Sequence, residues 1–346
     1  MGRRQRLLLE AERRWDGLRR SRRAGRTPAH FRIDTYLGHG GAEGVVVRGR
    51  VLDNPPPAPV MEGEGLGAAL RRSVSQFVTD ELPGVPLRIA VGDATAEVVT
   101  DGEGYFRAEL RPSDVVSPWQ EGWVELAGEY RGLTGHRAPV RVRVPGPEAR
   151  FGIVSDIDDT ILETGVQRVG QMLRQTFAGS ALTRTPFPGA AELYRDLVAA
   201  GQGNPVFYVS SSPWNLHAFL LGFLRHRDFP LGPVLLRDLI GGHDGRARKH
   251  ERIEEVLRLH PRLPFVLIGD SGEKDPQVYA DIVRAHPGRI RAVYIREVRL
   301  DPGDGRVEQV TDAWEEDVPF VLAADSDGVR RHAERIGLLT TPAAGS

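Results

Sequence analysis

The chain has 346 residues, enough for two domains, and its hydrophobic fraction of 40% and charged fraction of 27% are typical of a globular protein. It contains no cysteine, which excludes disulfides and cysteine-ligated metal sites. No apolar stretch is long enough to span a bilayer, and the apolar run at Leu7, Leu8 and Leu9 is too short for a signal peptide. These features predict a cytoplasmic protein.

The formal net charge is −1, but the charges are unevenly distributed along the chain. Residues 1–30 hold ten arginines and three acidic residues, a net charge of +7. Residues 3–24 are predicted to form a basic amphipathic helix whose apolar face carries Leu7, Leu8, Ala11, Trp15 and Leu18. Two interpretations stay open: the helix binds peripherally to an anionic membrane, or it docks on its own protein.

Residues 31–148 favour a β domain. Five segments have alternating or continuous apolar residues and are separated by glycine and proline residues. They lie at 44–52, 85–92, 96–110, 122–130 and 138–146. Asp101-Gly102 is a turn signal inside the third segment, and residues 67–80 are predicted to form a short helix. The expected architecture is a β-sandwich.

From residue 149 to 340 the pattern changes to alternating strands and helices. Strands are predicted at 151–155, 205–210, 233–237, 264–269 and 290–297, and helices at 189–200, 214–227, 248–259, 276–286 and 326–336. This alternation predicts an α/β fold with a doubly wound parallel sheet. Ligands of such sheets bind beyond the carboxyl ends of the strands, so polar residues there are candidates for a site.

The first parallel strand is followed by three carboxylates in four positions: Asp156, Asp158 and Asp159. Such a cluster is costly at a half-buried strand end unless a cation or a reaction requires it. Clustered carboxylate oxygens suit Mg²⁺. One carboxylate can attack phosphorus to form an aspartyl-phosphate, and a carboxyl group two residues further can exchange protons with the leaving oxygen and with water.

The other strand ends supply complementary groups. Ser210 ends the second strand and Ser211 follows it, and Asp270, with Asp275 five residues further, follows the fourth. Lys249 lies near the start of the helix after the third strand. Serine hydroxyls and an ammonium group can hold phosphoryl oxygens.

The small number of lysines supports a functional role for Lys249. Only two of the 46 basic residues are lysines, Lys249 and Lys274, an excess of arginine that is typical of a GC-rich genome. A site that needs a compact ammonium group would resist replacement by the wider guanidinium group. Each remaining lysine is therefore informative.

Taken together, D-x-D-x-T at 156–160, Ser210, Lys249 and G-D-x-x-x-x-D at 269–275 resemble the four motifs of the haloacid dehalogenase superfamily of phosphohydrolases. The resemblance implies that Asp156 is the nucleophile and Asp158 the acid and base. It also implies that Lys249 and Ser210, with Ser211 beside it, bind the phosphate.

The same resemblance implies a Mg²⁺ site. Its ligands would be Asp156, Asp158 through its backbone carbonyl, and Asp270, with Asp275 supporting or joining the metal shell. The role of Asp159 stays open.

Five longer segments resemble a narrower family. They are "SDIDDTI", "YVSSSPWNL", "LIGDSGEKDPQVY", "YIREV" and "VPFVLAADSDGVRRHAERIGL", and they are similar to the phosphatidate phosphatase family first described in yeast as an actin-patch protein. This resemblance implies hydrolysis of membrane phosphatidate to diacylglycerol. It leaves the role of residues 31–148 unassigned.

Several alternatives compete with this interpretation. A phosphatase of another bulky or soluble phosphomonoester and a catalytically inactive binding module of the same fold stay open, and no nucleic acid is expected. The stretch Gly269–Gly272 resembles a serine protease motif, but Glu273 stands where that motif needs glycine. An EF-hand is excluded because Ile161 and Gln167 stand where its loop needs glycine and glutamate.

Overall fold

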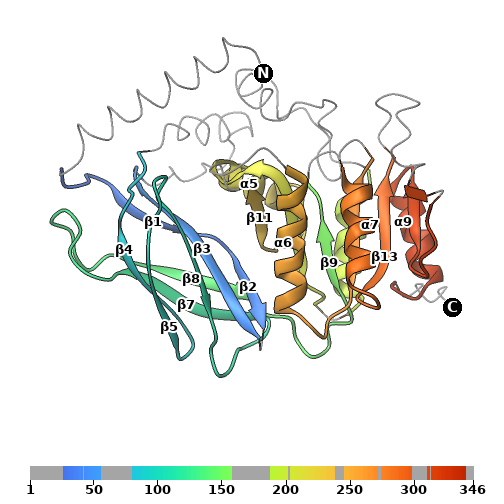
Figure 1. Ribbon diagram of the computed structural model, residues 1–346, viewed down its shortest axis with the longest axis horizontal. Coiled ribbons are helices and arrows are strands. Elements are labelled where there is room, and N and C mark those ends of the chain that lie inside the picture. Colours follow the sequence, from blue (N-terminus) through green and yellow to red (C-terminus); the bar gives the residue numbers. More distant parts are fainter. Residues whose placement is uncertain are drawn as a thin grey trace, which may run out of the picture.

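The computed structural model describes residues 26–41, 43–55, 80–157, 188–201, 203–237, 245–271, 274–297, 310–311 and 313–339. They form two sheets that lie side by side (Figure 1). The helix predicted over 3–24, nearly all of that over 67–80, and Asp158 and Asp159 lie outside the described residues. The division of the chain at 31–148 and 149–340 stays a prediction.

The first sheet has eight strands in the order β1-β3-β2-β8-β7-β4-β5, with β6 paired to β3. Neighbouring strands in this sheet are antiparallel except for β2 and β8, which pair in parallel. Every predicted β segment contains a strand, but the chain forms one connected sheet, so the expected β-sandwich is not established. The strands are β1 (Phe31–Thr35), β2 (Gly38–Gly41), β3 (Gly44–Asp53), β4 (Pro86–Val91), β5 (Ala94–Val99), β6 (Tyr105–Leu110), β7 (Trp119–Leu126) and β8 (Arg137–Arg143).

The turn at Asp101 follows its local sequence signal. The Asp101 Oδ1 atom accepts hydrogen bonds from the backbone N–H groups of Glu103 (2.8 Å) and Tyr105 (2.9 Å). The strands on either side nevertheless pair with different neighbours, β5 with β4 and β6 with β3. The sequence predicts this turn, but the strand pairing depends on contacts distant in the chain.

The second sheet is parallel throughout, with the order β11-β10-β9-β12-β13-β14. The five predicted strands are present, which confirms an α/β architecture with a parallel sheet. The sixth strand, a short edge strand, was not predicted. The strands are β9 (Gly152–Ser155), β10 (Val206–Pro213), β11 (Val234–Arg237), β12 (Phe265–Asp270), β13 (Ile290–Arg296) and β14 (Phe320–Ala323).

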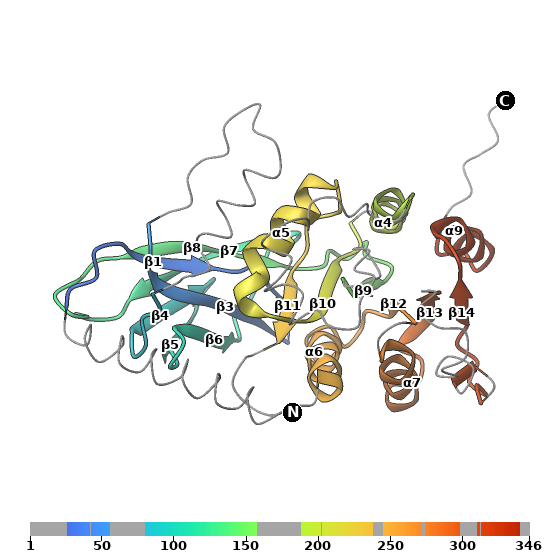
Figure 2. The same ribbon diagram turned by 90° about the horizontal axis from the view of Figure 1, so that it is seen from above.

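Helices cover both faces of this parallel sheet. Figure 2 shows α4, α5 and α9 on one face and α6 and α7 on the other. Their bounds are α4 (Ala190–Ala199), α5 (His217–His226), α6 (Gly245–Leu259), α7 (Asp275–Ala285) and α9 (Ser326–Arg335), with a 3₁₀ turn, η2 (Trp214–Leu216), before α5. Within the described part of the chain, no helix combines the length and the apolar character needed to cross a membrane.

The central strand β9 explains why a site forms at one edge. Its side chains alternate between the two apolar cores, Ile153 toward one and Val154 toward the other, and both are fully buried. Strands buried on both faces read as continuous apolar runs, as this segment does. Because β9 lies between β10 and β12 in parallel register, the residues that follow these three strands meet at the same edge of the sheet.

Candidate active site

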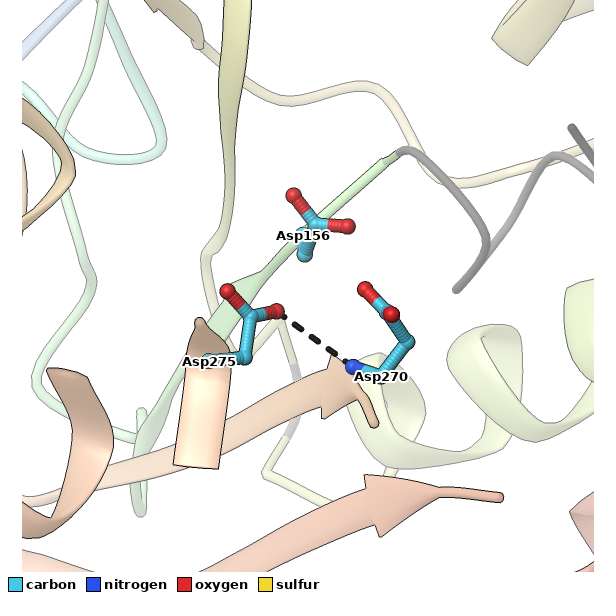
Figure 3. A group of neighbouring side chains, drawn as sticks. All are labelled: Asp156, Asp270 and Asp275. Carbon is cyan, nitrogen blue, oxygen red and sulfur yellow. Dashed lines mark hydrogen bonds between the residues drawn. The ribbon is translucent and has the colours of Figure 1, made fainter. Parts of the chain in front are cut away.

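Three buried carboxylates gather at this edge. Asp156 follows β9, Asp270 ends β12 and Asp275 begins α7, and all three are fully buried. One carboxylate oxygen of each lies within 4.8 Å of the others, and Figure 3 shows the three carboxylates near one another. The structure therefore brings together three of the four residues for which the sequence suggested a metal role.

Backbone contacts hold this cluster in place. The Asp156 N–H group donates to the Ile268 carbonyl (2.9 Å), which ties the end of β9 to β12. The Asp270 N–H group donates to the Asp275 Oδ2 atom (3.3 Å), as drawn in Figure 3. A Cβ atom on Gly269 would lie 2.3 Å from the same Oδ2 atom, so only glycine permits this close approach of α7 to β12.

Lys249 lies within the carboxylate cluster. Its side chain comes from the first half of α6 and is buried. The Nζ atom donates to Asp156 Oδ1 (2.7 Å) and to Asp275 Oδ1. Lys274, the residue before α7, is exposed. One lysine is thus part of the candidate site, and the other lies at the surface.

The charges of these groups do not balance. With all groups ionised, three carboxylates and one ammonium group sum to −3 + 1 = −2. A buried excess of negative charge is unfavourable unless a cation compensates it. The donors are hard carboxylate oxygens, which Mg²⁺ prefers, and a divalent ion would neutralise the cluster. The donor set therefore fits Mg²⁺.

The predicted phosphate-binding serines lie at the end of β10, the neighbour of β9. Ser210 is buried and Ser211 is half-buried. The backbone N–H group of Ser212 donates to the Ser210 Oγ atom (2.9 Å). The sheet topology places these hydroxyls at the same edge as Asp156, whereas Asp158 lies outside the described residues. A role in phosphate binding stays a prediction.

Two supporting residues were not predicted. The Ser155 Oγ atom donates to the Asp156 carbonyl (2.7 Å) and shares a hydrogen bond with the Tyr194 hydroxyl (2.6 Å). Burial raises the pKa of Tyr194, so its hydroxyl stays neutral. A serine inside an apolar strand is a weak local signal, but nothing in the local sequence marks Tyr194, which comes from α4.

Comparisons with known proteins match the part of the chain that holds this cluster. Residues 151–297 match the family model described as "Phosphatidate phosphatase APP1, catalytic domain". The chain is 31% identical over 174 residues to phosphatidate phosphatase APP1 of Saccharomyces cerevisiae, covering 47% of this chain and 29% of the relative. It is 32% identical over 157 residues to an uncharacterized protein of Schizosaccharomyces pombe, covering 44% and 26%.

The chain thus spans less than a third of the length of either curated relative. Among solved structures, a carbohydrate acetylesterase from Xanthomonas citri aligns over 81% of this chain and 73% of its own, with 12% identity and a TM-score of 0.29. This score is too low to support an inference. The family match includes Asp156, Ser210, Lys249, Asp270 and Asp275. Residues 151–297 are therefore similar to the catalytic domain of the phosphatidate phosphatase APP1 family.

Proposed function

We propose that this protein is a Mg²⁺-dependent phosphatase of the haloacid dehalogenase type that hydrolyses a phosphomonoester through an aspartyl-phosphate. The observation that carries the proposal is the buried cluster of Asp156, Asp270, Asp275 and Lys249, within the region that matches a phosphatase catalytic domain. Phosphatidate is the leading substrate because the family and the yeast relative are named for its hydrolysis. The lipid product would be diacylglycerol.

The proposed reaction has two steps. An Asp156 carboxylate oxygen attacks phosphorus, the ester P–O bond breaks, and the leaving oxygen takes a proton from Asp158. Asp158 then accepts a proton from water as the water oxygen attacks the aspartyl-phosphate, which releases phosphate and restores Asp156. Lys249, Ser210 and Ser211 would hold the phosphoryl oxygens and stabilise their negative charge.

The metal would be held by Asp156, Asp270 and Asp275, with the Asp158 backbone carbonyl as a further ligand by family resemblance. When bound, Mg²⁺ would offset the charge of the carboxylates and of the phosphoryl oxygens. Lys249, already in contact with two of these carboxylates, would keep them oriented.

A screen of phosphate release tests the proposed function. The purified protein is expected to release phosphate from phosphatidate vesicles in Mg²⁺, to lose this activity in EDTA and to regain it when Mg²⁺ is restored. Mg²⁺ should also raise the thermal midpoint of unfolding, because a ligand that binds only the native state stabilises it. The Asp270→Asn variant should lose most of this thermal shift.

The same screen separates the alternatives. Faster release from a soluble ester than from phosphatidate would favour another phosphomonoester as the substrate. No release from any ester, together with normal Mg²⁺ binding, would identify an inactive binding module of the same fold. No thermal shift with Mg²⁺ would contradict the metal site itself.

A peripheral membrane contact is part of the proposal. The net charge of +7 in residues 1–30 would attract anionic lipid, at about 1 kcal/mol for each basic residue near the surface. Removing residues 1–26 is expected to weaken co-sedimentation with anionic vesicles, most clearly at low salt, and to leave activity on a small soluble ester unchanged. Equal co-sedimentation of the full-length and shortened proteins would reject this role.

A further inference from the structure

The β domain, defined here as the eight-stranded sheet of residues 31–143, contacts the helix that carries Lys249. Glu255 on α6 is nearly buried and meets side chains from three strands of this sheet. Its Oε1 atom lies 3.1 Å from His39 Nε2, and its Oε2 atom accepts from Arg48 Nη2 (2.5 Å) and Arg107 Nη2 (2.8 Å). In a more exposed part of the same contact between α6 and the β domain, Arg258 forms a bidentate ion pair with Glu109 (2.8 and 2.9 Å).

The β domain also contacts the segment that follows the serines of β10. Tyr36, between β1 and β2, stacks on Trp214 with ring centroids 5.1 Å apart and an interplanar angle of 3°. The same ring stacks on His217 at 4.0 Å. The Arg48 guanidinium lies over the Trp214 ring, 5.9 Å from its centroid. Trp214 and His217 are only a few residues beyond Ser210 and Ser211.

Arg48 therefore contacts both segments that carry the predicted phosphate-binding residues. Its position follows from the alternation of β3: Val45, Val47 and Val51 enter the core of the β domain, so Arg48 points to the opposite face. The Tyr36 N–H group donates to the Arg48 carbonyl (2.9 Å), which holds the tyrosine and the arginine side by side. The arginine is itself buried.

The Glu255 contact is a charged one. Burial alone would raise the pKa of Glu255, but the His39 hydrogen bond and the Arg48 charge outweigh it and hold this pKa well below its usual range. Burial lowers the pKa of His39, so the imidazole is neutral near pH 7 and can donate to the carboxylate. Hydrogen bonds between charged groups are stronger and more directional than neutral ones.

Directional contacts, those of Glu255 among them, complement the apolar packing of α6. The helix packs on the sheet through Ile253, Val256 and Leu257, and apolar packing by itself is non-directional. Lys249 lies six residues before Glu255, about 9 Å along the helix axis at 1.5 Å per residue. Fixing Glu255 thus restricts both the rotation and the sliding of α6, and with them the position of the Lys249 ammonium group.

We propose that Arg48 is a positioning residue of the active site, which aligns α6 through Glu255 and the segment after β10 through Trp214. The β domain would then contribute to turnover by aligning Lys249 and the serines. The kinetic part of this inference rests on the proposed phosphatase function. The structural part does not.

Two variants test the proposal, and a third serves as the control. Arg48→Lys keeps the charge but cannot reach Glu255 and cover Trp214 together, because lysine lacks the planar guanidinium group. Glu255→Gln removes the charge of the partner and retains its shape. Arg258→Ala removes an ion pair from the same helix and interface but leaves Arg48 untouched. Each is compared with wild type by its kcat and KM for the best ester of the screen, its thermal midpoint, and amide hydrogen exchange over residues 206–217 and 245–257.

Arg48→Lys and Glu255→Gln are expected to lower kcat by about 10-fold to 100-fold with KM changed less than about twofold, since small displacements of catalytic groups cost rate. Both should accelerate exchange in the two segments, whereas Arg258→Ala should retain more than about half of kcat and wild-type exchange over 206–217. If the first two variants retain kcat, or if the control loses as much, the proposal is wrong. If the wild-type protein releases no phosphate, the phosphatase proposal fails. Hydrogen exchange then tests by itself whether Arg48 aligns the two segments.

Discussion

Replacing Asp156 by asparagine is expected to lower phosphate release by roughly 10⁴-fold or more, a loss typical of removing a nucleophile. The amide cannot attack phosphorus, and it also loses its charged contact with Lys249 Nζ. The fold should survive because the substitution is nearly isosteric and removes one of three mutually repelling buried carboxylates. In EDTA, the thermal midpoint of the variant is therefore expected to equal or exceed that of wild type.

Steady-state rates at saturating Mg²⁺ and thermal unfolding in EDTA check this prediction. Asp196→Asn is a suitable control, because Asp196 is an exposed aspartate on α4 whose ion pair with Arg330 lies at the surface. That variant should behave as wild type in both measurements. Near-normal phosphate release by folded Asp156→Asn protein would remove Asp156 as the nucleophile.

Replacing Lys249 by arginine is expected to lower kcat by about 10²-fold to 10³-fold, the usual cost of a misplaced charge-stabilising donor, or roughly 3 to 4 kcal/mol. Arginine is the usual basic residue of this chain, at 44 of its 46 lysine and arginine positions, so at a surface position this substitution should have little effect. At this position, however, the ammonium group is buried in contact with Asp156 and Asp275. A guanidinium group is wider, planar and forked, and cannot occupy the same space.

Lys274→Arg is the matched control, because Lys274 is the other lysine of the chain and is exposed. It should retain more than about half of wild-type activity. Both variants are compared at saturating Mg²⁺, with thermal midpoints to show that they are folded. If Lys249→Arg also retains more than about half of the activity, the phosphate role given to Lys249 is wrong.

Much of the α/β unit was predictable from sequence because its signals are local. Apolar runs of strand length, such as 264–269, alternate with amphipathic segments, and this rhythm indicates parallel strands joined by helices. Parallel strands place their carboxyl ends at one edge, so the proximity of Asp156 and Asp270 follows from topology alone. The motif spacing then pointed to Asp275 and Lys249 through family resemblance.

Weak local patterns limited the prediction elsewhere. Strand β2 has the sequence GHGG, which shows no apolar alternation, and its pairing comes from β3 and β8. Strand β14 is a four-residue edge strand, and its apolar run FVLA was not predicted as a strand. The eight strands of the β domain form one connected sheet because the parallel pairing of β2 with β8 joins its two four-stranded halves.

By itself, the sequence predicted the candidate residues for phosphate chemistry. It also determined that β9 and β12 place Asp156 and Asp270 at one edge of the sheet, because strand periodicity and strand-end position are properties of short segments. Only the tertiary structure decided that Lys249 lies between Asp156 and Asp275, and that Arg48 meets Glu255, 207 residues further along the chain. His39, Arg48 and Glu255 have no common motif. Their contact forms only where the β domain packs against α6, where each buried charge requires a partner.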